Sequence, residues 1–183
     1  MIFDRFRLTR KSVFRYPMDP APRTAVLAAC FRQARFPAKS PIRVFPRGWS
    51  EEVAAFAPAA LASTREQLFG LAAAERPPSL THAVIVLESP GDGLLSAGER
   101  ERLWRAFRVP VFEQIVGARG RLVAAECEAH EGLHVETPGL PWGSLPSQGY
   151  RLELAACGCG RNTPRLVSAL PAERTRSVAA YAK

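Results

Sequence analysis

The chain has 183 residues and a formal net charge of +8, a length that suits one domain with a substantial core. Its apolar content of 47% and charged content of 23% are ordinary for a globular protein, and no apolar run approaches the roughly 20 residues of a membrane span. Three of the four cysteines cluster with histidines, which argues against a secreted disulfide scaffold.

The positive charge is concentrated in residues 1–48, where eleven Lys or Arg face two Asp. A solvated surface, or a segment docked on an acidic surface, is favoured over a nucleic-acid site. Arginine-rich usage together with abundant Ala and Pro is typical of a GC-rich genome, so the arginine bias alone carries little functional weight. We expect no membrane partner. Nucleic-acid binding through residues 1–48 stays a less favoured alternative, because aromatic side chains alternate with the basic ones: Phe3, Phe6, Phe14 and Tyr16. The N-terminus lacks the apolar segment of a secretory signal, so we expect a cytoplasmic protein.

The first third of the chain contains helix signals and one short strand. Residues 24–35 (TAVLAACFRQAR) have apolar side chains at helical spacing, which predicts a helix with Cys30 buried on its apolar face. Residues 42–45 (IRVF) predict a short strand. Ser50 and the two glutamates after it predict a capped helix that runs to about Ala57.

A helix and then a βαβ unit are predicted next. The first helix begins near Ser63 or Thr64, each of which is followed three residues later by Glu or Gln. Residues 82–87 (HAVIVL) predict a strand buried on both faces, and residues 109–115 predict another. Between them, Ser96 and its capping box begin a helix over residues 98–107. That helix presents three large side chains on one face: Leu103, Trp104 and Phe107.

The last third is predicted to be rich in strands. Residues 121–128 and 132–136 predict a β-hairpin, and a loop rich in Pro and Gly follows at 137–148. Residues 149–155 predict a strand, and residues 163–167 (TPRLV) predict one more.

These patterns predict an α/β fold in three parts. A basic N-terminal segment covers residues 1–48, an α/β domain covers residues 49–170, and a weakly helical tail covers residues 171–183.

The strongest chemical signal is a set of possible zinc ligands. Cys127 and His134 lie on the two strands of the expected hairpin, while Cys157 and Cys159 flank one glycine in a knuckle. Three thiols and one imidazole form the Cys₃His set that tetrahedral zinc uses in structural sites. His130 is the rival imidazole, but it lies in the turn and is expected to face water. The alternative is a buried Cys127 beside an unpaired or oxidised Cys-x-Cys.

No catalytic residue is predicted. Glu126, Glu128 and Glu131 could serve as acid/base carboxylates, but hairpin residues of this kind are usually solvated, and we expect that here. The chain has no Ser/His/Asp order, no G-x-G-x-x-G and no P-loop.

The cysteine motifs resemble those of a known family. ECEAHEGLHVE followed by CGCGRNTPRL resembles segments of phenylacetate-coenzyme A ligases, which are adenylate-forming enzymes. The resemblance covers about residues 82–167 and, weakly, residues 49–75. It implies part of an adenylate-forming-ligase-like sheet with flanking helices and a zinc-clipped β-hairpin region. The equivalents of the ligands in zinc-bearing members of the family are Cys127, His134, Cys157 and Cys159.

The chain departs from the family where nucleotides bind. The family's Tyr-Gly-x-Thr-Glu corresponds to residues 112–117 (FEQIVG), and its Tyr-x-Thr-Gly-Asp corresponds to residues 150–154 (YRLEL). No Ser/Thr/Gly-rich phosphate loop is present, and about 16 residues follow the match, where the family has a domain with a catalytic lysine.

These departures favour an inactive, zinc-stabilised relative of part of a ligase over an enzyme. We expect such a chain to act as a binding or regulatory module, with a full-length ligase or another protein as its partner. The alternative is an acyl- or aryl-CoA ligase, or a subunit of one, that forms an acyl-adenylate from ATP and a carboxylic acid. Enzymatic activity stays open at this stage.

Overall fold

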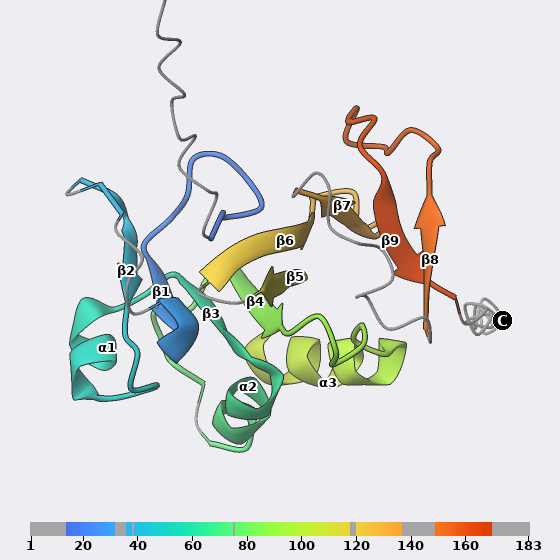
Figure 1. Cartoon of the computed structure of the whole chain (residues 1–183). Helices are drawn as coiled ribbons and strands as arrows, with labels where there is room; N and C mark the ends of the chain where they lie inside the picture. The colour runs from blue at the N-terminus through green and yellow to red at the C-terminus, as the bar shows by residue number, and fades with distance from the viewer. Residues whose placement is uncertain are drawn as a thin grey trace, which may run out of the picture.

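One mixed sheet with helices on one face organises the chain in its computed structural model (Figure 1). The structure describes residues 14–31, 36–37, 39–74, 76–117, 120–136 and 149–169. In chain order, the elements are β1 Thr24–Leu27, the 3-10 turn η1 Ala29–Phe31, β2 Ile42–Val44, α1 Glu51–Phe56, β3 Ala60–Thr64, α2 Arg65–Ala72, β4 Ala83–Glu88, α3 Ala97–Phe107, β5 Val111–Gly117, β6 Arg121–Glu126, β7 Leu133–Val135, β8 Tyr150–Glu153 and β9 Arg165–Ser168.

The sheet has a parallel half and an antiparallel half. Its strand order is β2-β1-β3-β4-β5-β6-β7-β9-β8. The first five of these strands pair in parallel, and the pairings from β5 to β8 are antiparallel. Helices α2 and α3 provide the crossovers from β3 to β4 and from β4 to β5, so the α/β fold and its βαβ unit are confirmed.

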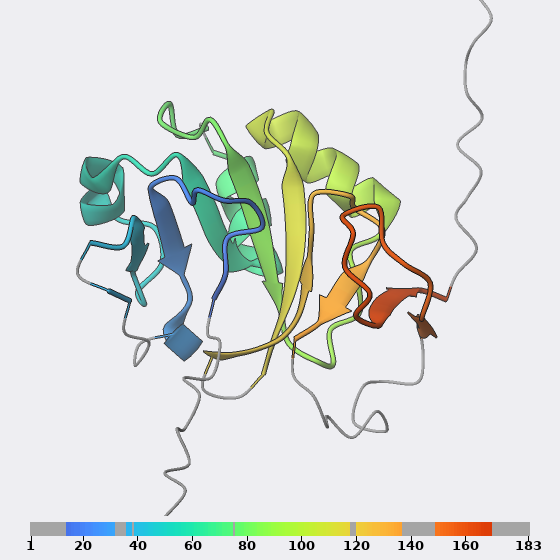
Figure 2. The ribbon, with the colours of Figure 1, turned by 90° about the horizontal axis from the view of Figure 1, so that it is seen from above.

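Two apolar layers hold the parallel half together. On the helix side, Val53, Leu68 and Leu103 pack against inward-facing side chains of β1, β3 and β4. On the other side, the segment that precedes β1 passes over the face of the sheet (Figure 2). It contributes Phe14 and Tyr16 to a second apolar cluster. Burial on both faces explains the continuous apolar run of β4.

The helix predicted over residues 24–35 is wrong. Thr24–Leu27 forms β1, with all four residues buried between β2 and β3, and residues 32–35 lie outside the described residues. Burial from both faces overrides the helical spacing of the apolar side chains. Cys30, expected in the core, is exposed, because the chain turns out of the sheet at η1.

The helix starts are close to their predicted positions. Ser96 accepts a hydrogen bond from Glu99 N while the Glu99 side chain accepts one from Ser96 N, which confirms the capping box of α3. Thr64 caps α2. Ser50 is the N-cap of α1, but its side chain makes no capping hydrogen bond, so that part of the prediction is wrong.

The sequence predicts neither strand β3 nor the exposure of Trp104. Strand β3 was not predicted, because its alanine-rich sequence has little β propensity and neighbouring strands impose the conformation. Trp104 is 44% exposed, whereas Leu103 and Phe107 are buried. The side chain of Trp104 points to the side of the buried face of α3, where the guanidinium of Arg108 lies over its ring.

The predicted strands of the last third are present as β6, β7, β8 and β9. The expected loop at 137–148 and the tail at 171–183 lie outside the described residues. Strands β1 and β2 belong to the same sheet as the later strands, while the predicted domain boundaries at 48/49 and 170/171 stay predictions. None of the described helices has the length and apolar character needed to cross a membrane.

Candidate metal centre

The four predicted zinc ligands come from two places that the antiparallel half of the sheet brings together. Cys127 follows directly after β6, and His134 lies in the middle of β7, its paired strand. Cys157 and Cys159 lie in the knuckle between β8 and β9. Because β9 pairs with β7, the knuckle lies beside the hairpin.

The ligand atoms have the spacing of a tetrahedral site. All four lie within 4.8 Å of one another. The sulfurs of Cys127 and Cys157 are 3.6 Å apart, and Cys159 Sγ lies 3.4 Å from His134 Nε2. Zinc–sulfur bonds of about 2.3 Å and zinc–nitrogen bonds of about 2.0 Å imply about 3.8 Å between sulfurs and about 3.5 Å between sulfur and nitrogen. These two pairs match the distances around one tetrahedral ion, and the wider separations, up to 4.8 Å, require the ligand atoms to move slightly closer together.

The imidazole of His134 is oriented for coordination. Its side chain is fully buried, and Nδ1 lies 2.7 Å from the hydroxyl of Thr163, which leaves Nε2 facing Cys159. Burial, reinforced by the nearby charges of Arg161 and Arg165, lowers the pKa of His134 below its usual value. The ring is thus neutral at physiological pH, the form that binds a metal.

The thiols differ in their electrostatic surroundings. Burial raises the pKa of Cys127 to about 11. The backbone amide of Arg161 instead lowers the pKa of Cys159 to about 7. A divalent cation at the cluster would favour the thiolate form of each thiol, against the burial that raises the pKa of Cys127.

The knuckle is fixed against the hairpin by contacts outside the ligand set. Glu131 accepts a hydrogen bond of 2.9 Å from Gly158 N, and Arg165 donates to the backbone oxygen and the carboxylate of Glu131. Gly132 has φ of +106°, and a Cβ there would lie 2.6 Å from Leu166 O, so the hairpin needs glycine to approach β9. Hairpin and knuckle are therefore held together by more than the ligands.

His130 is separate from this cluster. Its side chain is 42% exposed, its Nδ1 lies 2.9 Å from Glu126 Oε1, and its ring stacks on Phe112 at a centroid distance of 4.6 Å.

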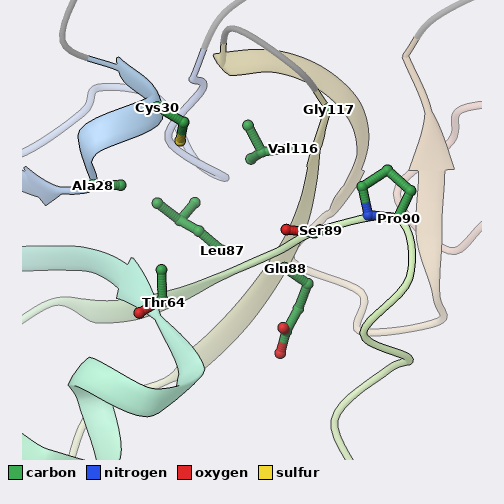
Figure 3. Close-up of a pocket in the computed structure, with 9 residues that line it drawn as sticks. All are labelled: Ala28, Cys30, Thr64, Leu87, Glu88, Ser89, Pro90, Val116 and Gly117. Carbon is green, nitrogen blue, oxygen red and sulfur yellow. The ribbon is translucent and has the colours of Figure 1, made fainter.

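A cavity of about 290 Å³ opens at the carboxyl ends of β1, β3, β4 and β5 (Figure 3). In open α/β sheets, ligands bind at this edge. Its polar wall consists of Cys30, Thr64, Glu88 and Ser89, and no Lys or Arg is among the described residues that line it. The rest of the wall is apolar: Ala28, Leu87, Pro90, Val116 and Gly117.

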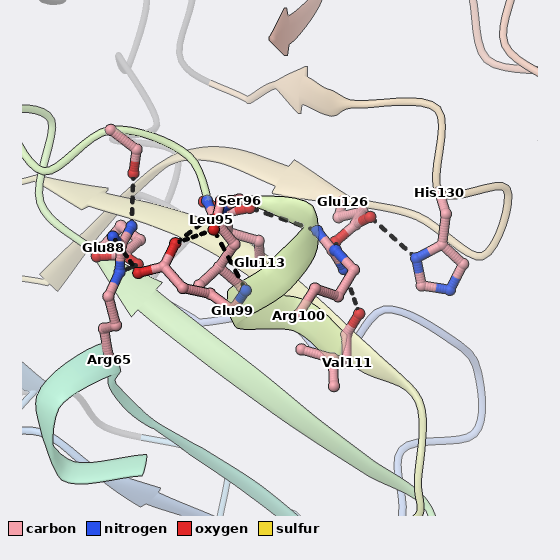
Figure 4. A network of polar contacts seen from close by, with 11 residues as sticks. Arg65, Glu88, Leu95, Ser96, Glu99, Arg100, Val111, Glu113, Glu126 and His130 are labelled. Atoms are coloured by element: carbon pink, nitrogen blue, oxygen red, sulfur yellow. Dashed lines mark hydrogen bonds and ion pairs between the residues drawn. The ribbon is translucent and has the colours of Figure 1, made fainter. Parts of the chain in front are cut away.

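Sequence reasoning missed a buried network of carboxylates on the helix side of the sheet (Figure 4). Glu88 on β4, Glu113 on β5 and Glu126 on β6 are each at most 3% exposed. Arg65 of α2 bonds Glu88 at 2.6 Å, and Arg100 of α3 approaches Glu113 and Glu126 at 3.5 and 3.1 Å. The signal was charged residues inside apolar strand runs, which must find partners when they are buried.

This network corrects the expectation that Glu126 is solvated. Its side chain points toward α3, where Arg100 compensates its burial. Glu128 and Glu131 are exposed, as expected.

Glu113 makes folding stability depend on pH. Burial raises the pKa of Glu113 from its usual 4.5 to about 8, so the folded chain holds a proton that the unfolded chain releases. The stabilisation is full below the unfolded-state pKa and is lost as pH rises toward 8, at up to about 1.4 kcal/mol per pH unit. Denaturant unfolding over a pH series should therefore show a falling free energy of unfolding in this range.

The substitution Glu113→Gln, a neutral isostere, should flatten that profile and be more stable than the wild type above pH 8. Glu66→Gln, at an exposed position of α2, is the control and should follow the wild-type profile. A Glu113→Gln profile as steep as that of the wild type would contradict the assignment of the proton to this residue.

Comparisons with known proteins give a match in structure alone. No family model matches the chain, and no curated protein matches it. Two solved structures of 2-hydroxyisobutyryl-CoA ligase do match, both in complex with 2-HIB-AMP and CoA. The open conformation is 16% identical, with 79% of this chain and 44% of that chain covered and a TM-score of 0.55. The thioesterification state is 17% identical, with coverages of 82% and 43% and a TM-score of 0.58.

The chain has the fold of part of an acyl-CoA ligase. It spans less than half the length of the two ligase chains. The expected adenylate-forming-ligase-like sheet is thus confirmed at the level of the fold, and the narrower resemblance to phenylacetate-coenzyme A ligases stays a proposal.

Proposed function

We propose that this chain is a zinc-stabilised relative of part of a phenylacetate-CoA-ligase-like enzyme, catalytically disabled, which acts as a binding or regulatory module. The proposal places it in the cytoplasm, where thiols stay reduced and available to a metal. Three features support it: the ligase fold, the Cys₃His cluster, and the wall of the cavity at the carboxyl edge of the sheet.

The composition of the cavity wall carries the proposal of inactivity. A nucleotide triphosphate with magnesium needs cations, a nest of backbone N–H groups or a metal-holding carboxylate to replace its water. Near the end of β5 the chain has Ile115 and Val116 where the family has Thr-Glu, and of these two Val116 lines the cavity. The one carboxylate of the wall, Glu88, is already bonded to Arg65. This wall suits a small, mostly apolar group better than a phosphate chain.

Zinc is the metal that the donor set favours. Thiolates with one imidazole in tetrahedral spacing select zinc over magnesium or calcium, which take oxygen ligands. With four protein donors, no coordination position is left for substrate, so the role would be structural. The ligands Cys127, His134, Cys157 and Cys159 would join the hairpin to the knuckle and so hold the last strands of the sheet in place.

The alternative function is an acyl- or aryl-CoA ligase, or one subunit of it. The position of the cavity at the carboxyl edge of the parallel strands favours this reading, since that is where α/β sheets bind ligands. Because the chain corresponds to less than half of the ligases it matches, the rest of such a site would come from elsewhere, and a full-length ligase or another protein would be the partner.

Calorimetry with ATP and magnesium tests the proposal. The purified chain should show no ATP binding at micromolar concentrations, and it should form no acyl-adenylate in pyrophosphate exchange over a panel of aryl and fatty acids. A full-length acyl-CoA ligase serves as the positive control. Micromolar ATP affinity, or pyrophosphate exchange that depends on one acid, would overturn the proposal that the chain is catalytically inactive and would favour the ligase function.

A further inference from the structure

Strand β8 is an open edge with exposed apolar side chains. It pairs with β9 on one side and ends the strand order, and no other strand of the described residues covers its outer side. Leu152 and Leu154 are 43% and 70% exposed. An edge with unpaired backbone groups and exposed leucines is a template for another strand.

The phase of the ladder shows which backbone groups are free to pair. Ala169 N donates to Gly149 O, so residues 149 and 169 form a hydrogen-bonded pair, and the register pairs Tyr150 with Ser168. Bonded and non-bonded pairs alternate in an antiparallel ladder. The N–H and C=O groups of Tyr150 and Leu152 therefore point away from β9, toward the outer side of the edge.

The edge is complementary to itself. If two copies pair antiparallel about a two-fold axis at Leu152, each Leu152 forms a hydrogen-bonded pair with its copy, which is the phase that the ladder requires. In this register, Arg151 of each copy lies opposite Glu153 of the other, as a close non-bonded pair. A shift of the axis by one residue would place like residues opposite and present the wrong backbone groups.

We propose that the chain forms a two-fold symmetric dimer in which the β8 strands of two copies pair antiparallel about Leu152. The two leucines lie across the axis, and two Arg151–Glu153 pairs flank it. In the free chain these two side chains already form a pair at 3.0 Å, and Glu153 also accepts hydrogen bonds from Leu154 N and Ala155 N. These contacts compete with the contacts between copies, so the dimer is weak.

Sedimentation velocity of the full chain, with zinc supplied, over about 1 μM to about 1 mM tests the proposal. The wild type should shift from monomer to dimer in this range. Arg151→Glu and Glu153→Arg each place like charges opposite one another and should raise the dissociation constant about tenfold or more. The decisive arm mixes the two variants, because opposite charges then face each other between different copies, and a heterodimer should form.

The mixture separates pairing between copies from the pair within one copy, since each variant alone lacks the latter. Both substituted side chains are at least 30% exposed, so melting temperatures should match that of the wild type and report folding. Wild type that stays monomeric at about 1 mM overturns the proposal. So does a dimer that both single variants form as tightly as the wild type, or a mixture that gains no affinity.

Discussion

Cys127→Ser should reduce the zinc content of the purified chain from about one ion to well below that and destabilise it by about 3 kcal/mol or more. The physical reason is that metal binding to a site absent from the unfolded state adds directly to folding stability. Cys127 is 1% exposed, and its sulfur lies 3.6 Å from that of Cys157. Elemental analysis and thermal unfolding, each with and without a chelator, measure the two effects.

Cys30→Ser is the matched control for this prediction. It removes the one cysteine outside the cluster, at an exposed position, and should leave both the zinc content and the response to chelator unchanged. If Cys127→Ser and Cys30→Ser lose equal amounts of metal and stability, the cluster does not hold the ion. Full stability of the wild type in chelator would equally contradict the account.

Arg100→Leu should destabilise the chain by about 3 kcal/mol at neutral pH. The substitution leaves the buried carboxylate of Glu126 with its contact to His130 but without the guanidinium of Arg100, and removal of the charge that compensates a buried carboxylate costs more than the pair contributes. Arg100 also donates to Val111 O at 2.5 Å, so α3 loses its polar attachment to β5. Denaturant unfolding gives the difference in free energy.

Arg105→Leu is the control on the same helix. Arg105 pairs with Glu101 at 2.8 Å, but the two side chains are 70% and 50% exposed, and exposed pairs of this spacing contribute less than about 1 kcal/mol. If the two substitutions lower the free energy of unfolding equally, Arg100 does not compensate the buried charge of Glu126.

The parts that the sequence predicts correctly are those in which local chemistry and the fold agree. The capping box of Ser96 and Glu99 determines where α3 begins. The apolar run at 83–88 is rich in β-branched residues and buries both of its faces only as a strand between other strands. Among the metal-ligand candidates, Cys127 lies at the end of β6 and His134 lies within β7, while the other two lie in the knuckle. The pairing of β6 with β7 and of β7 with β9 brings all four together.

The missed features depend on contacts between distant segments. Thr24–Leu27 has the spacing of a helix face, and only burial between β2 and β3 makes it a strand. Glu126 looks like an exposed hairpin residue until α3 places Arg100 above it. Cys30 leaves the core because η1 turns away from the sheet, a change of direction that no local signal marks.

Zinc K-edge X-ray absorption of the purified chain tests the central claim, that three thiolates and one imidazole close a tetrahedral site between the hairpin and the knuckle. The spectrum should fit three sulfur ligands at about 2.3 Å and one nitrogen at about 2.0 Å, and His134→Ala should replace or remove the nitrogen shell while Cys30→Ser leaves the spectrum unchanged. A shell of oxygen and nitrogen alone, or a chain purified without metal that takes up none, would contradict it.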